Sequence, residues 1–131
     1  MSIPRHDLTI LAVSDLSRAV RFYIDGLGWP PRVQVPVYVE LELPDGRGLG
    51  LYAREAFVTN TGEAASPTPS SGTTSTELYL RCDDLDAAEA RLLSAGARML
   101  ADRAHKPWGD EATYFADPDG NVVVLARVLP H

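Results

Sequence analysis

The sequence predicts an α+β fold made of two tandem β-α-β-β-β modules. The first observation is an echo: an apolar stretch at 8–13 runs into an acidic helix start, and 77–82 repeats that pattern sixty-nine positions later. A second echo relates 39–46 to 113–120 at an offset of seventy-four, and both segments end in Pro-Asp-Gly. Two copies of one structural unit therefore account for the chain.

The length limits how independent these copies can be. A chain of 131 residues is long enough for one hydrophobic core but too short for two separate ones. We therefore expect a single domain, 1–131, with module one at 5–56 and module two at 77–128. Together the modules should form a curved mixed sheet with helices on its outer face.

In module one, β-branched and aliphatic residues at 8–13 indicate a strand. The next segment predicts a helix, because its apolar residues fall on one helical face: Leu16, Ala19, Val20, Tyr23, Ile24 and Leu27. Ser14 or Asp15 can cap this helix, and Gly26 and Gly28 permit the left-handed backbone that ends it.

Module two repeats these signals. Asp83 or Asp84 can cap a helix, and Gly96 ends it. Its predicted apolar stripe is Leu85, Ala88, Leu92 and Ala95. In both modules the Pro-Asp-Gly sequence predicts a hairpin turn, because proline presets the turn and glycine tolerates positive φ.

Between the modules, residues 57–76 are expected to form a linker. From Thr59 onward this segment is rich in Thr, Ser, Pro, Gly and Ala and poor in large side chains, which predicts mobility. A binding lid is the alternative function for it.

Composition excludes some partners. The formal net charge is −6 and Lys106 is the only lysine, which argues against nucleic-acid binding. Cys82 is the only cysteine, no apolar run approaches the length of a membrane span, and no leader-like segment opens the chain. The expectation is a cytoplasmic protein with no membrane or nucleic-acid partner.

Alternation along the predicted strands separates a helix-covered face from an open face. The open face collects tyrosines and charged residues: Tyr38, Glu40, Glu42, Tyr52, Arg54, Glu77, Tyr79, Arg81 and Tyr114. One interpretation is an open surface with ordinary cross-strand pairs. The other is a ligand cleft, whose acidic groups and tyrosine rings favour a cationic or flat aromatic molecule.

The repeat, together with four motifs, resembles the vicinal oxygen chelate superfamily, which includes glyoxalase I, extradiol dioxygenases and the fosfomycin- and bleomycin-resistance proteins. The motifs are Val13-Ser14-Asp15-Leu16-Ser17-Arg18-Ala19-Val20-Arg21-Phe22-Tyr23, Gly26-Leu27-Gly28-Trp29, Pro107-Trp108-Gly109 and Asp117-Pro118-Asp119-Gly120-Asn121. The resemblance implies a glyoxalase/bleomycin-resistance fold and a homodimer, in which two chains complete a cleft and sometimes exchange modules.

Enzymes of this superfamily hold a divalent metal with four side chains. The resemblance places those ligand positions at Leu8, Gly50, Glu77 and Val124. Leucine, glycine and valine offer no side-chain donor, so only Glu77 could bind metal. We therefore expect no catalytic metal and no other cofactor.

Other residues offer weaker alternatives. His6 shares the open face with Leu8 and could join Glu40, Glu42 and Glu77 in an irregular metal site.

A general base is a separate possibility. His105, beside Trp108 on a predicted mouth loop, could serve as one, and Cys82 is expected to be an apolar filler rather than a nucleophile.

The first hypothesis is thus a metal-free binding protein of the bleomycin-resistance type, an antibiotic-resistance role, with Trp108 among the ligand-binding residues. The second is a metal-dependent or metal-free lyase, isomerase or dioxygenase using Glu77 or His105. A third is an accessory module whose open sheet binds a partner protein.

Overall fold

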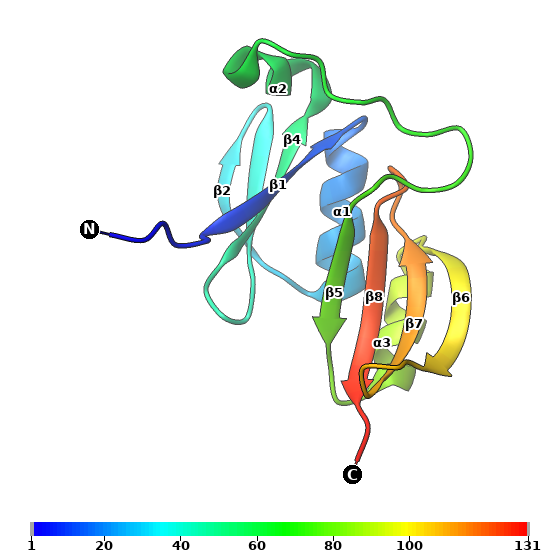
Figure 1. Cartoon of the computed structure of the whole chain (residues 1–131). Helices are drawn as coiled ribbons and strands as arrows, with labels where there is room; N and C mark the ends of the chain where they lie inside the picture. The colour runs from blue at the N-terminus through cyan, green and yellow to red at the C-terminus, as the bar shows by residue number, and fades with distance from the viewer. Residues whose placement is uncertain (1, 131) are drawn as a thin grey trace. The chain divides into compact units, whose positions relative to one another are not determined.

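The computed structural model describes residues 2–130 and confirms the α+β class (Figure 1). Its elements, in chain order, are β1 (Leu8–Val13), α1 (Leu16–Leu27), β2 (Pro31–Val35), β3 (Tyr38–Glu42), β4 (Gly48–Ala53), α2 (Arg54–Thr61), β5 (Glu77–Arg81), α3 (Leu85–Ser94), β6 (Arg98–His105), β7 (Asp110–Ala116) and β8 (Val122–Val128). No helix within residues 2–130 has the length and apolar character needed to cross a bilayer.

The strands form two four-stranded mixed sheets of the same topology, β1-β4-β3-β2 and β5-β8-β7-β6. The parallel pairs are β1 with β4 and β5 with β8, and all other neighbouring strands are antiparallel. The register repeats with the topology: Leu8 pairs with Gly48 in the first sheet, and Glu77 pairs with Val122 in the second. Both offsets found in the sequence are therefore structural equivalences.

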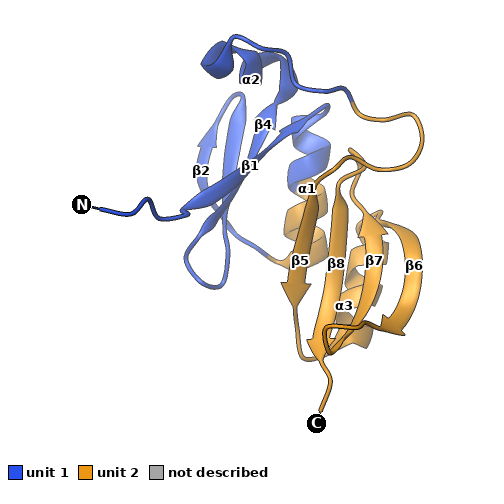
Figure 2. Cartoon of the chain, viewed as in Figure 1, with its two compact units in different colours: residues 1–20, 29–67 blue, residues 21–28, 68–131 orange. Residues whose placement is uncertain are grey.

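The chain divides into two compact units, 1–20 with 29–67 and 21–28 with 68–131 (Figure 2). The division falls inside α1, whose last two turns pack with the second unit. In the first unit the buried aliphatic side chains are Leu11, Val13, Val39, Leu41, Leu49 and Leu51. In the second unit the largest fully buried side chains are Tyr23, Phe115, Leu85, Leu92, Leu125, Val123, Val124 and Thr113.

Helix α2 is an element that the sequence pattern did not predict. It begins at Arg54, which was expected to continue β4 on the open sheet face. That placement was wrong: the chain turns helical after Ala53, and the Arg54 guanidinium instead donates to the Ala12 carbonyl at 3.3 Å. Glu55 in the first turn favours the helix electrostatically, since a carboxylate stabilises the positive end of a helix dipole.

The end of the segment between the modules carries side-chain hydrogen bonds. The Thr68 hydroxyl bonds the Asp119 carboxylate at 2.8 Å, and the Thr74 hydroxyl bonds Asn121 Oδ1 at 2.7 Å. Both bonds attach the segment to the turn between β7 and β8.

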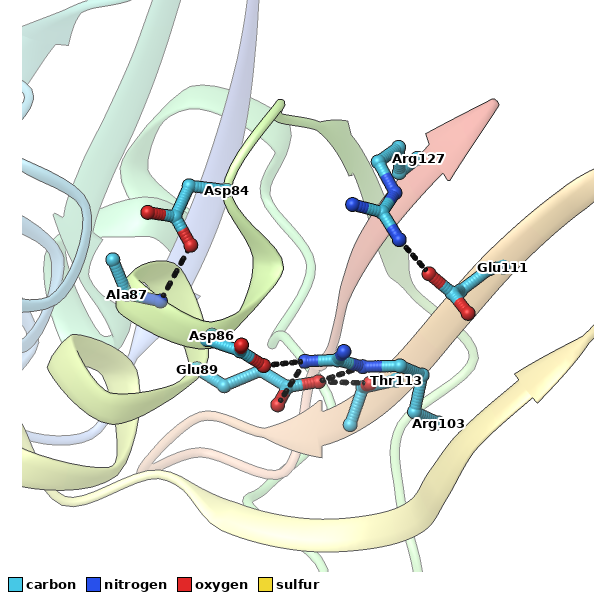
Figure 3. Close-up of polar contacts among 8 residues, drawn as sticks. All are labelled: Asp84, Asp86, Ala87, Glu89, Arg103, Glu111, Thr113 and Arg127. Carbon is cyan, nitrogen blue, oxygen red and sulfur yellow. Dashed lines mark hydrogen bonds and ion pairs between the residues drawn. The ribbon is translucent and has the colours of Figure 1, made fainter. Parts of the chain in front are cut away.

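Acidic side chains cap two helices as the sequence indicated. Asp15 accepts from the Arg18 amide at 3.0 Å, and Asp84 accepts from the Ala87 amide at 3.0 Å (Figure 3). Each carboxylate satisfies an amide that has no partner inside its own helix.

Ion pairs attach α3 to its sheet. Arg103 of β6 bonds Asp86 at 2.6 Å and Glu89 at 2.9 Å, and Glu89 also accepts from the buried Thr113 hydroxyl of β7 (Figure 3). These contacts show that Thr113 faces the helix, so the alternate β7 residues Ala112 and Tyr114 face the open side.

A buried carboxylate joins α1 to the β7–β8 turn inside the second unit. The Tyr23 hydroxyl donates to Asp117 Oδ2 at 2.6 Å, and the amides of Asp119 and Asn121 donate to Asp117 Oδ1 at 2.9 and 2.8 Å. Gly120 takes a φ of 84°, the left-handed conformation expected for the glycine of the Pro-Asp-Gly turn.

The Tyr23→Phe variant is expected to lose stability less steeply than the wild type in alkaline solution. Burial and the Asp117 carboxylate hold the pKa of Tyr23 well above its ordinary value of 10.0. In the unfolded chain the phenol ionises near that ordinary value, so its contribution is complete below about pH 10 and is lost as the pH rises toward the folded pKa. Urea midpoints between about pH 8 and pH 11 measure the slope, and equal slopes in both proteins would contradict this.

Candidate functional site

The open face of the second sheet has a dry apolar floor between two tyrosine rings. Ala112, Val124 and Ala126 have no solvent exposure, and Tyr79 and Tyr114 pack against them. The register explains this arrangement, since Val124 of β8 pairs with Tyr79 of β5 on one side and with Tyr114 of β7 on the other. Small side chains in the floor leave room for the rings beside them.

Tyr79 is held by partners on both sides of its hydroxyl. The hydroxyl donates to Asp110 Oδ2 at 2.5 Å and accepts from Trp108 Nε1 at 2.8 Å. Arg81 donates to the same Asp110 oxygen at 2.9 Å. The Asp110 side chain is only 3% exposed, and a buried carboxylate needs partners within the protein. Arg81 balances its charge, and Arg81 and Tyr79 supply its hydrogen bonds.

This network determines what Tyr79 can do chemically. Burial and the hydrogen bond to Asp110 raise the pKa of Tyr79 above its ordinary value. Burial and the Glu77 carboxylate raise the pKa of Tyr114 in the same way. Both phenols stay protonated near neutral pH, so these tyrosines offer ring faces and hydroxyl groups rather than a general base.

The aromatic surface of this face is exposed at one point and carries two cations. Trp108 lies in the turn between β6 and β7, is 58% exposed, and meets the Tyr79 ring edge-on with a centroid distance of 6.4 Å. The Arg81 guanidinium lies 5.4 Å from the Tyr79 centroid, and the Lys106 ammonium lies 4.8 Å from the Tyr114 centroid. Both distances are within the range of cation–π attraction.

On the open face of the first sheet, the polar side chains bond to one another. Glu40 accepts from Tyr38 at 2.6 Å and from Arg32 at 2.6 Å, and these two bonds lower the pKa of Glu40. The Tyr38 and Tyr52 rings pack edge-on at 5.4 Å.

The Tyr38 ring covers Gly50 as well. A Cβ at Gly50 would lie 2.5 Å from the Tyr38 hydroxyl oxygen and 2.9 Å from Ile10 Cγ1. The ring therefore occupies the space that a side chain at position 50 would need.

The pattern that describes the glyoxalase/bleomycin resistance protein/dioxygenase superfamily matches residues 5–125 of this chain. The chain belongs to this superfamily.

Solved structures of superfamily members share the fold. A glyoxalase-related enzyme from Fulvimarina pelagi is 25% identical, with a TM-score of 0.83 over 95% of this chain and 88% of that one. A glyoxalase/bleomycin resistance protein/dioxygenase from Nocardioides is 27% identical, with a TM-score of 0.81 over 98% and 86% of the two chains. A family member from Burkholderia phytofirmans, 17% identical with a TM-score of 0.79 over 96% and 100%, supports the fold alone. No curated protein matches significantly.

The metal of the superfamily enzymes does not fit the residues found here. Of its four expected ligand positions, Leu8, Gly50 and Val124 carry no donor, and the Tyr38 ring covers position 50. Val124 is part of the dry floor with no exposure. Among residues 2–130, no three His, Cys, Asp or Glu side chains gather as a metal-binding group would require. Glu77 remains as an exposed carboxylate at the end of β5.

The structure separates His105 from the aromatic residues. His105 lies at the end of β6, and its Nε2 is 3.8 Å from Glu111 Oε2, while Glu111 also pairs with Arg127 (Figure 3). Glu111 shares its face with Thr113, so this group lies on the helix side of the sheet and not beside Tyr79.

The remaining sequence candidates, His6 and Cys82, have local surroundings of their own. His6 Nε2 contacts the Thr9 hydroxyl at 3.0 Å. Cys82 is half-buried, and burial together with Asp83 and Asp84 raises the pKa of its thiol, which disfavours the nucleophilic thiolate.

Sequence reasoning missed three residues of these faces. Asp110 could have been found by extending the open-face alternation of Ala112 and Tyr114 two residues back. Arg32 and Lys106 lie in or beside β2 and β6, whose exposed burial pattern has no clean alternation from which to assign faces. Only the pairing with Glu40 and Tyr114 identifies them.

Proposed function

We propose that this protein binds a small planar aromatic molecule on the open face of its second sheet and does not transform it. The observation that carries this proposal is the exposed Trp108 ring, fixed through its Nε1 by the hydroxyl of Tyr79. An indole held in one orientation loses little conformational freedom when a ligand stacks on it. The partly buried rings of Tyr79 and Tyr114, which pack on the dry floor, offer further apolar surface to the same ligand.

A flat ring suits this face better than a bare cation, the other class that the sequence suggested. Asp110, the buried carboxylate of this face, is already bonded to Arg81 and Tyr79. A ligand cation would have to compete with these internal partners, which are closer than a new ligand could easily come.

Naphthalene-based probes test the proposal through tryptophan fluorescence. Ligand stacking is expected to quench the exposed Trp108, while the buried Trp29 keeps its emission. The Trp108→Ala variant should weaken binding measured by calorimetry about tenfold, the equivalent of roughly 1.4 kcal/mol for a lost ring contact. The matched control is Trp29→Phe, which should retain the quenching. Equal affinity in the wild type and Trp108→Ala would refute this site.

A catalytic function is the alternative, and it depends on Glu77. This carboxylate is exposed and close enough to Tyr114 to raise the pKa of that phenol. If the protein turns over any lyase or isomerase substrate, Glu77→Gln should abolish the activity. Unchanged turnover in Glu77→Gln would remove Glu77 as the base.

A further inference from the structure

Two positively charged side chains lie over the rings of the two tyrosines that flank the floor. Arg81 lies on the Tyr79 ring and Lys106 lies on the Tyr114 ring, and both rings contact Val124 in the floor. The chain has 18 acidic residues against 12 basic ones, and its only lysine is at this face. In an acidic protein, two cations beside one apolar floor form a local charge opposite to that of the whole molecule.

These cations keep unused hydrogen-bond donors. Arg81 contributes one Nη atom to Asp110, while 58% of its side chain stays exposed. Lys106 forms no ion pair with any carboxylate among residues 2–130. A guanidinium with free N–H groups and an ammonium with three donors are the groups that receive a carboxylate or phosphate.

The acidic groups near this face cancel only part of that local charge. Asp110 pairs with Arg81, so the net positive charge comes from Lys106, while Arg81 still offers N–H groups that Asp110 does not use. Glu77 lies at the opposite end of β5 from Arg81, since both belong to the five-residue strand Glu77–Arg81. A charged ligand would therefore place a negative group toward Arg81 and Lys106 and away from Glu77.

We infer that the ligand of this face is an aromatic acid, whose flat ring contacts Trp108 and whose anionic group is received by Arg81 and Lys106. This inference rests on the proposed function, because it names the ligand class of the same surface. It differs from the cationic ligand that the acidic sequence favoured. The anion gives orientation and the ring gives contact area, so each contributes separately to affinity.

Three probes with the same ring system separate the two contributions. They are 2-naphthoate, the neutral 2-naphthamide and the cationic 2-naphthylmethylammonium, titrated by calorimetry at low and at moderate salt. Naphthoate should bind about tenfold more tightly than the amide, and added salt should narrow that difference because it screens exposed charges. The ammonium probe should bind more weakly than the amide.

Charge-removing variants identify the receiving groups. Lys106→Gln and Arg81→Gln should each weaken naphthoate several-fold and leave the amide unchanged. Lys106→Gln carries the test if Arg81→Gln unfolds, because Lys106 has no buried carboxylate partner. Arg21→Gln, at an exposed position of α1, removes the same charge elsewhere and should leave the affinity for all three probes unchanged.

The titration results distinguish a failure of the anionic-ligand inference from a failure of the proposed aromatic site. Equal affinity for naphthoate and the amide, with the binding of both weakened in Trp108→Ala, would overturn the anionic ligand and retain the aromatic site. Tightest binding of the ammonium probe would also overturn the inference. Binding of none of the three probes would overturn the aromatic site itself.

Discussion

Replacing Asp117 by alanine is expected to lower the free energy of unfolding by about 3 to 5 kcal/mol. Four donors reach this buried carboxylate: the Tyr23 hydroxyl, the backbone amides of Asp119 and Asn121, and the Asn121 side-chain amide at 3.0 Å. Alanine leaves all four without their acceptor. All four donors belong to the buried residues Tyr23, Asp119 and Asn121, where water replaces the lost bonds poorly.

Urea denaturation followed by circular dichroism measures the effect. Asp45→Ala is a suitable control, because Asp45 is an exposed acid in the other Pro-Asp-Gly turn. It accepts from the Arg47 amide at 2.9 Å and forms an exposed ion pair with the Arg47 side chain at 3.8 Å. That control should cost about 1 kcal/mol or less. The Tyr23→Phe variant, which removes one of the four donors, should lie between the two. A loss at Asp117 no greater than that at Asp45 would contradict a structural role for the network.

The second large effect is expected at Gly50, the position to which the resemblance assigns a metal ligand. Gly50→Ala should destabilise the protein by about 1 to 3 kcal/mol, because the added Cβ would overlap the Tyr38 ring. Its Cβ would lie 2.7 Å from Tyr38 Cε1, closer than carbon atoms approach without displacement. The ring cannot turn away freely, since its hydroxyl is bonded to Glu40 and its face packs with Tyr52.

A double-mutant cycle with Tyr38→Ala tests this explanation. If the overlap is the cause, the cost of Gly50→Ala should be much smaller in the Tyr38→Ala background, giving a coupling energy of about 1 kcal/mol or more. Additive effects would mean that the Tyr38 ring is not what limits position 50. The same overlap applies to Gly50→Glu, so restoring the carboxylate of the superfamily enzymes requires Tyr38 to move as well.

These two positions show different sources of constraint in this fold. Asp117 stabilises the second unit by satisfying donors that come from distant parts of the chain, Tyr23 among them. At Gly50, the ring of Tyr38 fills the space that a metal-binding side chain would need. The chain thus keeps the superfamily fold and presents a different surface chemistry on it.

Features that depend on local periodicity could be predicted from the amino-acid sequence. The two echoes predicted two equivalent β-α-β-β-β modules, because strand alternation and helical spacing are set by backbone geometry within a few residues. Asp15, Asp84 and the two Pro-Asp-Gly turns were identifiable for the same reason. Alternation also placed Tyr79 and Tyr114 together on the open face. The strand order and register came from the structure.

Which polar groups on those faces are already bonded to partners within the protein can be seen only in the tertiary structure. Asp110 lies 29 residues from Arg81 and 31 from Tyr79 in the sequence, and no local pattern predicts that the three side chains are in contact. Arg32 bonds Glu40 across a hairpin, so this carboxylate already has a cationic partner within the protein, a pairing that the sequence pattern did not predict. Ion pairing depends on which side chains packing brings within a few ångströms, and that is a property of the folded chain rather than of sequence spacing.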